Sequence, residues 1–286
     1  MTDSEKLMYE LLHQISSTDA PIVFKGGLIT NLILENNNYH QVQRATIDID
    51  ANWIGKAPSM NHLIETINSS LGYLGSKYEV KPYREYGTKQ SAGLALIDKA
   101  SQTKIVTMDI EIMPTLGSTL YSYGSMSIKG VLANEIVADK ISSISSDAVY
   151  KYRAKDLIDL YALTHCSTIE TKDIYIMSEK RNHPIGSFDG LLNHKSDVEH
   201  AYNKLKRINN KPDFELLYSY LSGFLKPFIE KDTTEKIWNP SIRCWSDSVE
   251  IEKIRFSRAT QKAFAEKAAE KPMQQHNDKS KDDITH

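Results

Sequence analysis

The sequence predicts an α+β fold, in which a mixed sheet flanked by helices is followed by an α-helical C-terminal domain. Three observations predict it. Before residue 130, apolar runs with the alternation of strands lie between amphipathic helical segments. From Ala133 onward, the apolar spacing is almost entirely helical. The chain has 286 residues, 40% hydrophobic and 25% charged, which is the composition of a globular protein long enough for two domains.

These observations predict three parts of the chain. Residues 1–130 are expected to form the α+β core, and residues 131–270 the helical C-terminal domain. Residues 271–286 consist mostly of Gln, His, Asn, Asp, Lys and Ser. This composition cannot bury a core, so we expect disorder there.

Each element is predicted from its own period, in chain order. The core begins with a helix at residues 4–15, where the apolar residues repeat at helical spacing, and a strand at residues 22–24 leads into a helix at 28–33. A strand carrying Asp48 and Asp50 comes next, before a helix at 62–71 and strands at 78–86, 92–97 and 104–113. The second part is predicted to hold helices at 133–145, 153–165, 171–179, 198–207, 214–224 and 251–270.

A pair of glycines separates the first predicted strand from the helix that follows it. Gly26 and Gly27 let the backbone turn sharply directly after Lys25. Backbone N–H groups at the start of a helix attract anions, so phosphate is a suitable ligand for this turn. The segment lacks the long glycine loop of a P-loop and the spacing of a dinucleotide-binding fingerprint.

Two carboxylates lie two residues apart on the next predicted strand. Side chains alternate along a strand, which would put Thr46, Asp48 and Asp50 on one face and Ile47 and Ile49 on the other. Two close carboxylates repel each other, and a divalent cation relieves the repulsion. Magnesium takes oxygen ligands and bridges to phosphates, which fits this pair. An exposed strand end is the alternative interpretation of the same pattern.

The strand predicted at 104–113 offers a third carboxylate. Its alternation puts Asp109 and Glu111 on the polar face of the strand. We take Asp109 as the candidate metal ligand, although the pattern allows either residue.

Two charged residues of the helical part are further candidates. Lys140 lies at the edge of the apolar stripe of its helix, where its ammonium either pairs with phosphates or extends into solvent. Asp156 shares a helix face with Arg153 and with apolar residues. A carboxylate in that position needs a partner, so a catalytic role and an ion pair with Arg153 or Lys140 stand as alternatives.

Charge and cysteine content exclude several classes of protein. With a formal net charge of -2, any contact with nucleic acid must come from local basic clusters, such as those at residues 151–155 and 204–211. Cys166 and Cys244 are too few for a disulfide framework, and the histidines show no metal-ligand spacing. Without a signal peptide or a long apolar run, a cytoplasmic protein with no membrane span is expected.

Four motifs stand in one order along the chain: Lys25-Gly26-Gly27-Leu28, Arg44-Ala-Thr46-Ile-Asp48-Ile-Asp50, Glu135-Ile-Val-Ala-Asp-Lys140, and Arg153-Ala-Lys155-Asp156-Leu-Ile-Asp159-Leu. Together they resemble the AbiEii/AbiGii toxin family of nucleotidyltransferases, which includes the MenT-like toxins. This family belongs to the DNA polymerase β nucleotidyltransferase superfamily. The resemblance extends from about residue 5 to residue 245.

The resemblance implies a nucleotidyltransferase-type core and a metal-dependent enzyme that moves NMP from an NTP and releases pyrophosphate. The implied catalytic residues are Asp48, Asp50, Lys140 and Asp156. The implied ligands of Mg²⁺ or Mn²⁺ are Asp48, Asp50 and Asp109. The implied contacts to the nucleotide come from Lys25, Gly26, Gly27, Arg44, Thr46 and Lys140.

The resemblance also implies a role as the toxin of a bacterial toxin-antitoxin, or abortive infection, system that acts against phage. The expected acceptor is RNA, in particular the acceptor end of tRNA, whose modification would block translation. The expected partners are therefore NTP, RNA and a cognate antitoxin that need not bind the toxin directly. Two alternatives stay open: a nucleotidyltransferase acting on a small molecule or a protein hydroxyl, and a catalytically inactive nucleotide-binding interaction module.

Overall fold

The computed structural model describes residues 3–86, 91–146 and 153–247. The chain divides into one compact unit, residues 1–245, and a second unit, residues 246–286. The fold and the site described below lie in the first unit. The predicted tail at 271–286 and the predicted helix at 251–270 lie outside the described residues. The predicted domain boundary after residue 130 stays a prediction.

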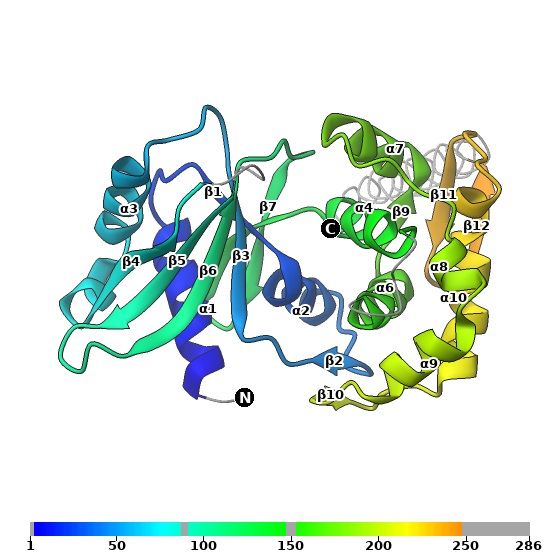
Figure 1. Ribbon diagram of the computed structural model, residues 1–286, viewed down its shortest axis with the longest axis horizontal. Coiled ribbons are helices and arrows are strands. Elements are labelled where there is room, and N and C mark those ends of the chain that lie inside the picture. The colour runs from blue at the N-terminus through cyan, green and yellow to red at the C-terminus, as the bar shows by residue number, and fades with distance from the viewer. Residues whose placement is uncertain (1–2, 87–90, 147–152, 248–286) are drawn as a thin grey trace, which may run out of the picture. The chain divides into compact units, whose positions relative to one another are not determined.

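The first unit is built on a seven-stranded mixed sheet, which confirms the predicted fold class (Figure 1). Strand β3 occupies the centre and pairs antiparallel with β1 and parallel with β6. Strand β1 also pairs in parallel with β8. The spatial order is β4 (Tyr78–Arg84), β5 (Ser91–Asp98), β6 (Lys104–Glu111), β3 (Asp48–Trp53), β1 (Ile22–Lys25), β8 (Met126–Val131) and β7 (Ser118–Tyr123).

Helices from the first half of the chain pack on this sheet. Helix α1 (Asp3–Ser16) packs on β8 and β1, and it buries Leu11, Leu12 and Ile15 on one side because these residues recur at helical spacing. Helix α2 (Gly26–Asn36) follows β1 directly and packs on β3 and β1. Helix α3 (Met60–Ser69) and the 3₁₀ helix η1 (Gly72–Ser76) lie against β4. The Ser59 side chain caps α3 by accepting the His62 N–H.

The second half of the chain is mainly helical, as predicted. Helix α6 is its centre, since it contacts α2, α4 and α10 and buries Leu157, Leu160 and Leu163 (Figure 1). The Asp213 carboxylate starts α10 by accepting N–H groups of the first turn. The helices are α4 (Ala133–Ile144), α6 (Ala154–Cys166), α7 (Thr171–Lys180), α8 (Asp189–Leu192), α9 (Lys195–Asn203) and α10 (Phe214–Ile229).

Several short strands were not predicted. The hairpin of β7 and β8 completes the sheet, but β7 is largely exposed and therefore lacks a clear apolar alternation. Strand β2 (Gln43–Arg44) pairs with β10 (Ile208–Asn209), and β9 (Ile169–Glu170) pairs with β11 (Lys236–Asn239). Strand β12 (Cys244–Asp247) follows β11 along the chain. Elements of two to four residues are too short to show a period.

Two predicted boundaries are wrong. Strand β3 begins only at Asp48, and Ile47 before it is 65% exposed, so the predicted alternation does not extend back to Thr46. Helix α9 ends at Asn203 rather than at residue 207, because the chain turns there toward β10.

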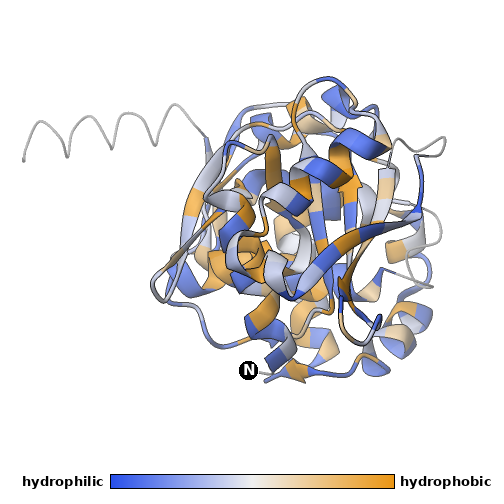
Figure 2. Cartoon of the chain, turned by 90° about the vertical axis from the view of Figure 1, so that its left-hand side faces the viewer, coloured by the Kyte–Doolittle hydropathy of each residue, from blue (hydrophilic) through white to orange (hydrophobic). Residues whose placement is uncertain are grey.

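Hydrophobic and hydrophilic residues alternate along the helices and strands, as expected for elements with one buried side (Figure 2). Within the described part of the chain, no helix combines the length and the apolar character needed to cross a membrane.

Candidate active site

The start of α2 lies directly against the segment that carries the paired aspartates. Gly26 has a φ of +70°, and a Cβ added to it would lie 2.0 Å from Oδ2 of Asp50. A Cβ added to Gly27 would lie 3.0 Å from the Thr46 hydroxyl and 3.1 Å from Nη2 of Arg44. No side chain caps the helix start. The two glycines therefore leave a bare helix N-terminus beside Asp50, which suits an anion.

Three charged residues form a row across the centre of the sheet. Lys25 of β1 is opposite Asp50 of β3, and Asp50 is in register with Asp109 of β6. Residues in register share one face of the sheet. Asp48 lies two residues earlier on β3 and shares this face. The structure thus brings together the predicted residues Lys25, Asp48, Asp50 and Asp109.

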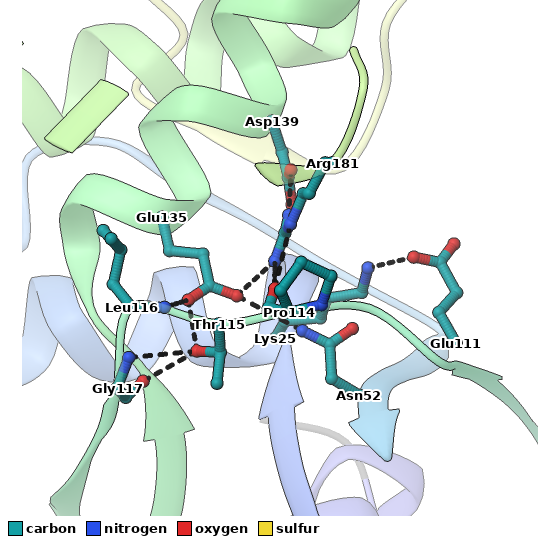
Figure 3. Close-up of polar contacts among 10 residues, drawn as sticks. All are labelled: Lys25, Asn52, Glu111, Pro114, Thr115, Leu116, Gly117, Glu135, Asp139 and Arg181. Atoms are coloured by element: carbon teal, nitrogen blue, oxygen red, sulfur yellow. Dashed lines mark hydrogen bonds and ion pairs between the residues drawn. The ribbon is translucent and has the colours of Figure 1, made fainter. Parts of the chain in front are cut away.

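The register also separates the two candidates for the third carboxylate. Asp109 lies beside Asp50, whereas Glu111 lies beside Asn52. The Glu111 carboxylate accepts a hydrogen bond from the Lys25 ammonium (Figure 3). The Asp109 carboxylate accepts from Nη2 of Arg84 at 2.8 Å and from the Tyr83 hydroxyl at 3.0 Å. By position Asp109 is the neighbour of the paired aspartates, yet its own oxygen is already engaged.

The acidic row is electrostatically unfavourable. Burial raises the pKa of Asp50, and the Asp48 and Asp109 carboxylates raise it further, while the Lys25 and Lys140 ammonium groups act in the opposite direction. Asp48 is exposed and free to reorient. In the described ranges, no three His, Cys, Asp or Glu side chains are already gathered as a metal-binding group. Asp48 and Asp50 offer two carboxylates, which is a donor set that Mg²⁺ or Mn²⁺ accepts together with water and phosphate oxygens.

A buried network of charges connects the sheet with α4 and α6. The Lys140 ammonium lies 2.5 Å from Oδ1 of Asp156 and 2.9 Å from Oδ2 of Asp159. Arg44 donates from Nε and Nη2 to the two oxygens of Asp159, each at 3.1 Å. Asp159 was not predicted as a site residue. Its position one turn after Asp156 on the same helix was the available signal.

The charges of this network remain ionised inside the protein. Burial alone would raise the pKa of Asp159, but the Lys140 ammonium and the Arg44 guanidinium outweigh it and hold the pKa below its ordinary value. Burial disfavours the charged form of Lys140, yet Asp159 and Asp156 hold its pKa above the ordinary value. Two cations therefore face two carboxylates close to the start of α2.

Asp156 differs from Asp159 in one respect. The ion pair with Lys140, one of the two interpretations of Asp156, is formed. The other oxygen, Oδ2, is buried and has no hydrogen-bond partner among the described residues. Nη1 of Arg153 lies 3.7 Å from it. The catalytic role of Asp156 stays a prediction, and Oδ2 is the atom that is free to perform it.

A second buried network holds α4 against β3 (Figure 3). The Glu135 carboxylate accepts from the Asn52 amide at 3.2 Å and from the Leu116 N–H at 3.0 Å. It also pairs with Arg181, whose guanidinium donates to the Pro114 carbonyl at 3.2 Å from Nε. Glu135 and Asn52 are completely buried. These contacts fix the start of α4 relative to the sheet and so position Lys140 further along the same helix.

The mixed sheet, with paired aspartates beside a glycine turn, defines the class of this protein as a nucleotidyltransferase. One family, described as "Nucleotidyl transferase AbiEii toxin, Type IV TA system", matches residues 7–219. The chain belongs to this AbiEii family of nucleotidyltransferase toxins, which confirms the resemblance seen in the sequence motifs.

Three solved structures are similar at low sequence identity. JHP933 from Helicobacter pylori is 16% identical with a TM-score of 0.48, covering 81% of this chain and 94% of that one. The MenT4 nucleotidyltransferase toxin from Mycobacterium tuberculosis is 14% identical with a TM-score of 0.45, covering 80% and 90%. An antigenic nucleotidyltransferase-like protein from Paracoccidioides brasiliensis is 13% identical with a TM-score of 0.39, covering 70% and 92%. A search of curated proteins gives no match.

Proposed function

We propose that this toxin transfers NMP from an NTP to RNA, that its target is the acceptor end of tRNA, and that the modification blocks translation. In this proposal the protein acts in the bacterial cytoplasm, contributes to phage defence by abortive infection, and is antagonised by a cognate antitoxin. The observation that carries the chemistry is the row of Lys25, Asp50 and Asp109 beside the bare start of α2. The choice of tRNA comes from the family resemblance.

The residues of the chain divide the work. The first turn of α2 would bind the triphosphate at Gly26 and Gly27, and Lys25, Arg44 and Lys140 would offset its charge. Thr46 lies against Gly27, where its hydroxyl can contact a phosphate oxygen. Asp48 and Asp50, with Asp109 as a third candidate, would hold Mg²⁺ or Mn²⁺, which supplies positive charge opposite the phosphates and orients them.

The reaction forms a bond between an acceptor hydroxyl oxygen and the α-phosphorus. The bond from this phosphorus to the bridging oxygen breaks, and pyrophosphate leaves. Oδ2 of Asp156 would accept the proton of the attacking hydroxyl, since this oxygen has no hydrogen-bond partner in the described structure. Alignment of the hydroxyl with the leaving group supplies much of the rate enhancement in such a transfer.

The test is a transfer assay with purified protein, magnesium, each α-labelled NTP in turn and total bacterial tRNA, resolved on a denaturing gel. Asp48→Asn should abolish labelling and keep the wild-type circular dichroism, because Asp48 is exposed. Asp19→Asn is the matched control, since Asp19 is also exposed and precedes β1 at the end away from Lys25. Label on a protein or small molecule in place of tRNA would support the alternative acceptors, and absence of nucleotide binding would support an inactive interaction module.

A further inference from the structure

A separate cavity of about 340 Å³ lies on the far side of Arg44 from the charge network. Its walls come from α1, α2, β2, β7 and β10. Asn31, one turn after Gly27 on α2, donates from its amide to the Arg44 carbonyl at 3.1 Å. Arg44 is therefore a shared wall, with Asp159 on one side and this cavity on the other.

The polar groups of the cavity can recognise the edge of a nucleobase. Side-chain amides supply both donors and acceptors, a carboxylate adds acceptors, and the volume lies within the range of small-ligand pockets. Single-stranded RNA is read through such hydrogen bonds to the edges of unstacked bases. The polar lining residues are Asn31, Glu35, Gln43, Arg44, Arg207 and Asn209.

The outer wall of the cavity carries exposed basic residues. Strand β10 is tied to β2, and the Ala45 N–H donates to the Arg207 carbonyl at 3.1 Å. Lys204, Lys206 and Arg207 are exposed, and their side chains form no ion pair with any residue that the structure describes. Lys211 of the same basic cluster is different, because its ammonium donates to carbonyls at the end of α9. Three cations thus remain available beside the cavity.

We infer that this cavity receives one nucleotide of the acceptor RNA and that Lys204, Lys206 and Arg207 contact the phosphates of the adjoining backbone. This inference rests on the proposed function and locates its acceptor. A polymer with repeated phosphates uses several cations in succession, whereas a single NTP already has its phosphates placed at Gly26 and Gly27. The RNA strand would then reach the transfer site past Arg44.

The test measures RNA binding without NTP, by fluorescence anisotropy of a short fluorescein-labelled single-stranded RNA over a series of salt concentrations. The triple variant Lys204→Ala/Lys206→Ala/Arg207→Ala should bind more weakly. Its plot of log affinity against log salt should be shallower by about 2, since each phosphate contact to a single strand contributes about 0.7 to the slope. Lys180→Ala is the matched control, because Lys180 is exposed at the end of α7, which does not pack on β2 or β10.

Gln43→Ala tests the cavity itself. Loss of one hydrogen bond to a base should weaken RNA binding about 2- to 10-fold and leave the KM for NTP unchanged. Wild-type affinity and slope in the triple variant would overturn the inference, and so would a raised KM for NTP in Gln43→Ala. If these variants label tRNA normally, the proposed function survives without this acceptor site. A wild-type protein that neither binds nor labels RNA would overturn both.

Discussion

The substitution Asp159→Asn keeps the size of a buried side chain and removes the carboxylate that two cations share. The Asp159 side chain is 4% exposed, and it accepts from Arg44 twice at 3.1 Å and from Lys140 at 2.9 Å. Removing one partner of a buried ion pair lowers the free energy of unfolding by about 3 to 5 kcal/mol. For a unit of this size each kcal/mol shifts Tm by about 2 to 4 °C, so Tm should fall by about 6 to 20 °C.

Thermal melts of the purified variant across pH measure this effect. The pKa of Asp159 is held below its ordinary value, so its stabilisation is fully present above the unfolded pKa of about 3.9 and is lost only as pH falls below it. The difference in Tm should thus be constant from neutral pH down to about pH 4. Glu215→Gln, which removes an exposed ion pair with Lys195, should leave Tm unchanged. A wild-type Tm for Asp159→Asn would refute the reasoning.

The row and the buried networks lead to further predictions. Burial raises the pKa of Asp50, so the folded state holds the extra proton and loses stability as pH rises past the unfolded pKa. Asp50→Asn should therefore melt above wild type at pH 7, lose this advantage below about pH 4, and transfer no nucleotide; a pH-independent difference would contradict this. Gly26→Ala should lower Tm and abolish NTP binding in calorimetry, because a Cβ there meets the Asp50 carboxylate; unchanged binding would refute the close packing. Arg181→Met leaves the buried Glu135 carboxylate without its cation and should cost about 3 to 5 kcal/mol in chemical denaturation. Arg84→Met, at a half-exposed pair, should cost less than about 1 kcal/mol, and equal losses would contradict the role of burial.

Residues within one element were predictable where the period was long. Strand β6 shows the predicted burial of Val106, Met108 and Ile110 on one face. The helices α1, α4 and α6 also follow their apolar spacing. These elements carry all the predicted site residues that come from helices and strands, so the local sequence was enough to place them on the right elements.

Relations between elements were not predictable from local pattern. The choice between Asp109 and Glu111 depends on the register of β6 against β3, and a register is set by pairing across strands. Asp159 was missed for the same reason, because its partners Arg44 and Lys140 lie on other elements. Lys211 was counted among the basic residues, yet it is bound to the end of α9. The Gly124 turn between β7 and β8 was a local signal that a closer search would have found.

The pairing of β2 with β10 determines when during synthesis the acceptor cavity can close. Arg44 and Ile208 face each other in this ribbon, although most of the chain lies between them. The strand with the paired aspartates leaves the ribosome early, but the outer wall of the cavity exists only after residue 209 has emerged. A nascent toxin is consequently harmless to the ribosome that is making it, and its activity begins close to the moment of release.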